Sequence, residues 1–300
     1  MTPREIIARA WAITTSEKPL WRWGFASSLF ETLLNVKLLG YQAYFAYSYY
    51  SGKEVGLFDD FAWLYRNIPA GAFFAILITF GLLLVIEFFL PHICSGAIIG
   101  LAAKAHRGQP VRGGLVLALH NFLQIFAIHE IFVLHGWAIV VSCISLMLRY
   151  IDGSVKYAGI VGILAIFLIS NLLKLCAGFA EEAVVLRKMG IGAGLAQSYK
   201  IFLSHMSHVM FVLLLLFVIS LRILLNALML LVLPAIILGL AFILALFLSP
   251  TVSYIIAGVV GFILIIAASY FFAYLHVFKQ TVWTLTYIEL SERKDVDEIL

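Results

Sequence analysis

Residues 69–103 read PAGAFFAILITFGLLLVIEFFLPHICSGAIIGLAA, a long apolar run interrupted by only two ionisable side chains, Glu87 and His92. About 20 apolar residues are enough to carry a helix across roughly 30 Å of hydrocarbon. Because a helix rises by about 1.5 Å per residue, this run is longer than that, and its helix would extend beyond the bilayer. We therefore predict a membrane-spanning helix over residues 69–103.

The rest of the chain has the same character. Its 300 residues are 63% hydrophobic and 12% charged, with a mean hydropathy of +1.05, which lies far outside the range of soluble proteins. We predict an all-α fold, a polytopic transmembrane helix bundle, in which apolar runs bounded by charged or turn-forming residues mark the spans. Six spans are expected, at 24–50, 69–103, 123–148, 156–186, 206–232 and 251–288.

A shorter apolar run lies between Pro234 and Pro250. It is too short to cross the bilayer comfortably. We interpret residues 234–250 as a re-entrant or interfacial segment, and a seventh span is the alternative.

The distribution of Lys and Arg predicts the orientation of the chain, because cytoplasmic loops retain positive residues. These residues concentrate at the two ends of the chain and in the second and fourth connections between spans. The N-terminal segment has no continuous apolar stretch typical of a cleavable signal peptide. We predict a multi-pass protein of a bacterial inner (plasma) membrane with both termini cytoplasmic. The cationic residues behind this prediction are Arg4, Arg9, Lys18, Arg22, Lys104, Arg107, Arg112, Arg187, Lys188, Lys200, Lys279, Arg293 and Lys294.

The chain also aligns with itself, which predicts an internal repeat. One alignment places His129 over His208, and a second, with a slightly larger offset, places Cys94 over Cys176. We predict one transmembrane domain, residues 1–300, made of repeat units at about 1–108, 109–188 and 189–290 with a short charged tail at 291–300. Each unit would be an amphipathic cytoplasmic helix followed by a membrane hairpin.

Four stretches carry a resemblance to a known family: AIIGLAAKAHRGQPV (97–111), GGLVLALHNFLQIF (113–126), EEAVVLRKMGIGAGLAQSYKIFLSH (181–205) and TVWTLTYIEL (281–290). Their order resembles the six-helix bacterial membrane domain attached to some glycerophosphoryl diester phosphodiesterases and found in related uncharacterised membrane proteins. The resemblance implies a fold and a topology. Only about a dozen residues follow Tyr287, so we expect no catalytic barrel and carry over no catalytic residue.

Ionisable side chains at membrane depth cost at least about 2.5–3.5 kcal/mol each, so each needs a partner or an aqueous cavity. Either these residues line a polar cavity for an ion or an anionic headgroup, or they pair with one another to fix the register of the helices. The repeat suggests that His92, Lys174 and His276 form one cationic level, which suits a phosphate group better than a metal. The candidate cavity residues are Glu31, Lys37, Glu87, His92, His129, Glu130, Lys174, His208 and His276.

The stretch IHEIFVLHG (128–136) resembles a zinc motif at first sight, but its two histidines have the wrong spacing. His129 and His135 are six residues apart, about 240° around a helix and about 9 Å along it, so one helix cannot offer both to one ion. His205 and His208 do share a face and could form half of a site. The three cysteines have no CxxC spacing. We predict no metal site and no cofactor.

No nucleophile elbow, phosphate loop or dinucleotide-binding pattern occurs in the sequence. We predict a non-enzymatic membrane protein that acts as a scaffold or binds lipids or partner proteins. Alternatives are a transporter or channel for a small solute, ion or lipid, and, less favoured, a membrane metalloenzyme. Expected partners are the lipid bilayer and its anionic headgroups, because Trp11, Trp21 and Trp23 alternate with basic residues. A protein partner or a homo-oligomer is a further alternative, whereas nucleic acid has no support because topology explains the net charge of +4.

Overall fold

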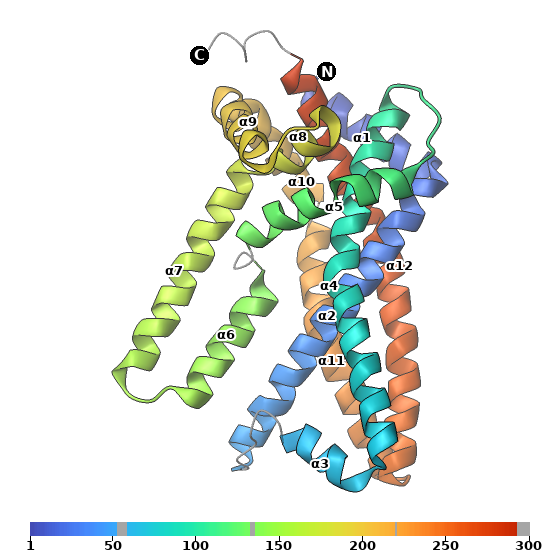
Figure 1. Ribbon diagram of the computed structural model, residues 1–300, viewed down its shortest axis with the longest axis vertical. Coiled ribbons are helices and arrows are strands. Elements are labelled where there is room, and N and C mark those ends of the chain that lie inside the picture. The colour runs from blue at the N-terminus through green and yellow to red at the C-terminus, as the bar shows by residue number, and fades with distance from the viewer. Residues whose placement is uncertain (53–58, 133–135, 220, 293–300) are drawn as a thin grey trace.

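Figure 1 shows the computed structural model of the protein, which describes residues 1–52, 59–132, 136–219 and 221–292. His135, Arg293, Lys294 and the rest of the tail lie outside the described residues. The described residues form helices and no strands, which confirms the predicted all-α fold class. In chain order the helices are α1 (Pro3–Ser16), α2 (Lys18–Tyr50), α3 (Asp59–Asn67), α4 (Ala70–His106), α5 (Gly114–Ile131), α6 (Trp137–Tyr150), α7 (Ser154–Cys176), α8 (Ala180–Arg187), α9 (Ile191–Ser204), α10 (Met206–Ile219), α11 (Leu221–Ala245) and α12 (Pro250–Ser291).

Three helical hairpins run along the long axis and point the same way (Figure 1). The first is α2 with α4, with α3 at its tip; the second is α6 with α7; the third is α11 with α12. Helices α1, α5, α8 and α9 gather at the opposite end, which we call the elbow end. The first and third hairpins pack together through α2 and α12, and α2 also packs against α4.

The main hydrophobic core lies at the elbow end. Ile6 of α1, Leu20 of α2, Leu101 of α4, Phe179 before α8 and Tyr287 of α12 are all buried in one cluster. The hairpin shafts instead expose many large apolar side chains. Exposed apolar side chains are compatible with lipid, which is as apolar as they are. The elbow end is therefore packed like a small globular domain, and the shafts are suited to the bilayer.

Two glycines bring α4 and α5 into close contact. A Cβ atom added at Gly96 would lie 2.9 Å from Ile125 Cδ1, and one at Gly100 would lie 2.6 Å from Leu117 Cδ1. Small residues at helix interfaces allow this close approach of backbones. The middle and end of α4 are thereby fixed against α5, including the turn that carries His92.

The second hairpin contacts the first through α6 and α2, and its other helix, α7, extends away from the bundle (Figure 1). Helix α7 has no buried residue among those described. Helix α6 touches the first hairpin through Arg149, whose Nη2 donates hydrogen bonds of 2.9 Å to Gln42 Oε1 and 2.6 Å to Ser145 Oγ. This polar contact fixes the second hairpin to α2.

The structure corrects the predicted number of spans. In the described part of the chain, four segments are long and apolar enough to cross a membrane, or five if a pair of helices with a 92° bend counts as one. Helix α2 is 33 residues long, but its polar side chains lower its mean hydropathy, and α6 has only 14 residues. One qualifying segment, α5, runs across the long axis (Figure 1), so its composition overstates its ability to span. The qualifying segments are Ala70–His106, Gly114–Ile131, Ser154–Arg187 and Pro250–Ser291, with Ile191–Ser204 and Met206–Phe217 as the bent pair.

Two predicted boundaries are also wrong. The third span, 123–148, divides between α5 and α6, because its first nine residues complete the crosswise helix. The fourth, 156–186, agrees with the qualifying segment Ser154–Arg187, within which the chain turns between α7 and α8. Residues 234–250 form neither a re-entrant segment nor a seventh span, because α11 continues through Pro234 to Ala245. The predicted long helices over 69–103 and 251–288 are confirmed as α4 and α12.

Candidate functional site

The most deeply buried of the predicted polar residues is Glu87. Its Oε2 atom lies 2.6 Å from Lys37 Nζ, so the pair joins α4 to α2. Glu87 is completely buried, whereas the Lys37 side chain is 29% exposed. A buried carboxylate costs less when a cation compensates it. This pair therefore holds α2 and α4 together near the middle of the first hairpin.

His92, His129 and Glu130 come together where α4 meets α5. His92 Nε2 and His129 Nδ1 each lie 3.8 Å from Glu130 Oε1. The two imidazole ring centroids are 4.4 Å apart. His92 is buried, and the other two are partly exposed. His129 and Glu130, from the stretch IHEIFVLHG, thus have His92 of another helix as a neighbour.

Two residues of the predicted cationic level, Lys174 and His276, have polar neighbours on other elements. Lys174 Nζ lies 3.6 Å from Glu181 Oε1, and His276 Nε2 lies 3.5 Å from Ser27 Oγ. Lys174 is close enough to His92 to act on it electrostatically, as Glu181 is to His276. A carboxylate, Glu181, therefore lies close to Lys174 and acts electrostatically on His276, as does the cation Lys279.

The remaining two predicted residues lie outside these close groups. Glu31 is exposed on α2, within electrostatic range of Lys279 on α12. His208 lies on α10, just past the 92° corner at His205.

Two polar contacts at the elbow end were not predicted. Ser198 Oγ accepts a hydrogen bond of 2.9 Å from the Phe179 backbone N–H and donates one of 2.8 Å to the Cys176 carbonyl. Gln280 Nε2 donates a hydrogen bond of 2.9 Å to Oε1 of the buried Glu182. The first contact stabilises the break between α7 and α8. A serine in an amphipathic helix gives no sequence signal of such a role.

A cavity of about 300 Å³ lies at the α1–α2 corner, beside α12. The chain turns at Glu17, whose backbone is extended, and α2 begins at Lys18 with proline as its second residue. Proline suits a first helical turn because no backbone donor is lost there. We call this cavity the elbow pocket; it is lined by Thr14, Thr15, Glu17, Lys18, Trp21, Arg22, Tyr270 and Tyr274.

Aromatic rings form one wall of the elbow pocket. The centroid of Trp21 lies 5.2 Å from that of Tyr270 and 6.2 Å from that of Tyr274. The indole also stacks on Phe25, one turn further along α2. Among the described residues, the buried Nε1 atom of Trp21 has no hydrogen-bond partner. The pocket thus combines two cations, hydroxyl groups and the rings of Trp21, Tyr270 and Tyr274.

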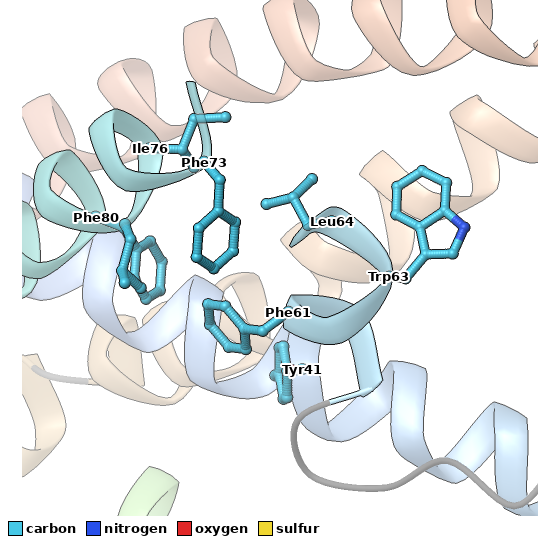
Figure 2. A pocket seen from close by; sticks show the side chains of 8 residues that line it. Tyr41, Phe61, Trp63, Leu64, Phe73, Ile76 and Phe80 are labelled. Atoms are coloured by element: carbon cyan, nitrogen blue, oxygen red, sulfur yellow. The ribbon is translucent and has the colours of Figure 1, made fainter. Parts of the chain in front are cut away.

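A second cavity, of about 380 Å³, lies at the tip of the first hairpin (Figure 2). Its lining comes from α2, α3 and α4 and is almost entirely apolar. Figure 2 shows the rings of Tyr41, Phe61, Phe73 and Phe80 gathered around it. Binding sites for specific ligands need a few polar groups to fix orientation. We interpret this cavity as packing between aromatic side chains at the membrane boundary.

No family model, curated protein or solved structure matches this chain.

Proposed function

We propose that this protein is a non-enzymatic multi-pass membrane scaffold that binds the headgroup of an anionic phospholipid in the elbow pocket. The observation that carries the proposal is the lining of this pocket, in which Lys18 and Arg22 occur together with aromatic side chains at the α1–α2 corner. Basic residues attract anionic lipid, and Trp and Tyr favour the level of the headgroups. We propose that the elbow end faces the cytoplasm.

The pocket supplies what a phosphodiester headgroup needs. The two cations can neutralise the phosphate and donate hydrogen bonds to its oxygens. The Glu17 carboxylate offsets part of the positive charge and suits a headgroup that carries hydroxyl groups. Below the indole, Phe25 continues the aromatic surface along α2 toward the shaft. Acyl chains would follow that surface.

The polar residues inside the bundle support a scaffold more than a transporter. Lys37 pairs with Glu87, and Lys174 pairs with Glu181. Among the described residues, neither the elbow pocket nor the aromatic cavity at the hairpin tip is lined by any of the nine predicted cavity residues. Ion pairs between helices fix their register. The similarity to phosphodiesterase membrane domains, a protein partner and self-association all remain proposals.

Binding of a short-chain anionic lipid tests the proposed function. We expect purified protein in detergent to bind dioctanoyl phosphatidylglycerol more tightly than dioctanoyl phosphatidylcholine. The double variant Lys18→Gln/Arg22→Gln should bind the anionic lipid about 30-fold more weakly, since each cation near the surface contributes about 1 kcal/mol. Arg66→Gln, at the opposite end of the molecule, is the matched control and should leave the affinity unchanged.

A competition arm separates the lipid from a soluble phosphate ester. Glycerol 3-phosphate shares the phosphate but lacks acyl chains, so we expect it to compete only at much higher concentrations. Equal affinity for the two would assign the pocket to a soluble ligand. Equal binding of both lipids by the wild-type protein would overturn the proposal.

A further inference from the structure

We propose that His92, His129 and Glu130 form a zinc-binding site between α4 and α5. The site is separate from the elbow pocket and does not depend on the proposed function. Each of the three residues can offer one ligand atom, and these atoms all lie within 4.8 Å of one another. Two of the separations, from Glu130 Oε1 to each histidine nitrogen, are 3.8 Å.

Two of the three ligand separations are close to those of a zinc site, and the third, between the two histidine nitrogens, is within 4.8 Å. Zinc binds nitrogen and carboxylate oxygen at about 2.0–2.2 Å with tetrahedral angles, so neighbouring ligand atoms lie about 3.3 Å apart. The two separations from Glu130 Oε1 exceed this by an amount that small side-chain rotations remove. Two imidazoles and one carboxylate are a ligand set used by zinc with one open position.

The packing of α4 against α5 holds the ligands in place. Gly96 and Gly100 permit the close approach of the helices one and two turns beyond His92. The His92 ring makes edge contacts with Phe126 and Phe88, at centroid distances of 5.4 and 6.4 Å. Because these aromatic groups enclose the imidazole, its ring orientation is fixed while Nε2 stays directed toward Glu130.

One neighbouring charge opposes a divalent cation. Lys174 is close enough to act electrostatically on both His92 and Glu130. Its ammonium group lies 3.6 Å from Glu181, so a carboxylate compensates part of its charge. Lys174 therefore weakens zinc binding without preventing it. This provides a variant expected to bind zinc more tightly.

Zinc retention by the full-length protein in detergent tests the site. We expect one zinc per chain after incubation with Zn²⁺ and removal of the excess. His92→Gln and Glu130→Gln should each weaken zinc binding by at least about tenfold. Loss of a group that only hydrogen-bonds a metal ligand already costs about that much, and these two residues would be ligands themselves. Lys174→Gln should tighten it. His205→Gln removes a histidine outside the trio and should change nothing.

Two further measurements keep the result decisive if the buried His92 variant fails to fold. His129 is partly exposed, so His129→Gln should fold and still lose zinc. Co²⁺ in place of zinc should give the visible absorption of a site with nitrogen ligands, and Glu130→Gln should change that spectrum. Less than stoichiometric zinc on the wild-type protein, or full retention by folded His129→Gln, would overturn the proposal.

Discussion

The Nζ atom of Lys37 lies 2.6 Å from Oε2 of Glu87, whose carboxylate is completely buried between α2 and α4. Lys37→Met would leave that carboxylate without its cation. Loss of one partner of a buried pair costs about 3–5 kcal/mol, and the partial exposure of Lys37 reduces this to roughly 2–4 kcal/mol. Thermal unfolding in detergent should show the loss.

The double variant Lys37→Met/Glu87→Leu is the control for this pair. Replacing both partners with apolar side chains removes the buried charge, so most of the stability should return. If the double variant were as unstable as the single one, the effect would come from lost packing and not from an unpaired charge.

Alanine substitutions at two glycines of α4 distinguish the effect of tight packing on stability from the effect of helix propensity. Gly100→Ala should destabilise the protein by about 1–3 kcal/mol, because the new Cβ would lie 2.6 Å from Leu117 Cδ1. Gly81→Ala in the same helix meets nothing within 4 Å. It should gain up to about 1 kcal/mol from the better helix propensity of alanine. Equal effects on unfolding temperature would contradict the close approach of α4 and α5.

Ser198 should stabilise the break between α7 and α8. Ser198→Ala leaves the Phe179 N–H without its acceptor, at a cost of about 1–3 kcal/mol. Ser204→Ala is the matched control, because that hydroxyl donates only to the carbonyl of Lys200 within its own helix. Hydrogen exchange should quicken around residues 177–180 in the first variant alone, and uniform exchange in both would contradict this role.

The predicted orientation can be checked by labelling. A reporter that is active only in the cytoplasm should be active when it is fused to either terminus, because basic residues concentrate at the elbow end. A cysteine introduced at Asn67, near the tip of the first hairpin, should react with an impermeant maleimide added outside the cell. If Asn67→Cys were labelled only after cell lysis, the orientation would be the opposite of the predicted one.

The sequence predicted α4 and α12 well, because their apolar runs are continuous. It did not predict the break at residues 177–179, where no proline or charge occurs and a serine from another helix provides the hydrogen bonds. The prediction of the third span was wrong because an amphipathic stretch continues into an apolar stretch without a clear boundary around residue 123. Local pattern could not show that α5 runs across the bundle.

The residues of the candidate sites were also predicted only in part, because helix packing brings together residues that lie far apart in the chain. Lys18, Trp21 and Arg22 stood out as an interfacial group by composition. Tyr270 and Tyr274 lie far later in the chain, in an apolar run, so only the packing of α12 against α2 joins them to that group. The spacing of His129 and His135 excluded a metal site within one helix. It gave no information about His92, which reaches His129 and Glu130 through the contact of α4 with α5.

The most direct measurement of the central claim is residue-level mapping of a photoreactive phosphatidylglycerol whose reactive group is in the headgroup. Cross-linked and digested in nanodiscs, the protein should carry the label mainly on residues 14–22 and 270–274, and Lys18→Gln/Arg22→Gln should lose it. Label spread evenly over the exposed shafts, or concentrated around the aromatic cavity of Phe61 and Phe73, would contradict headgroup binding in the elbow pocket.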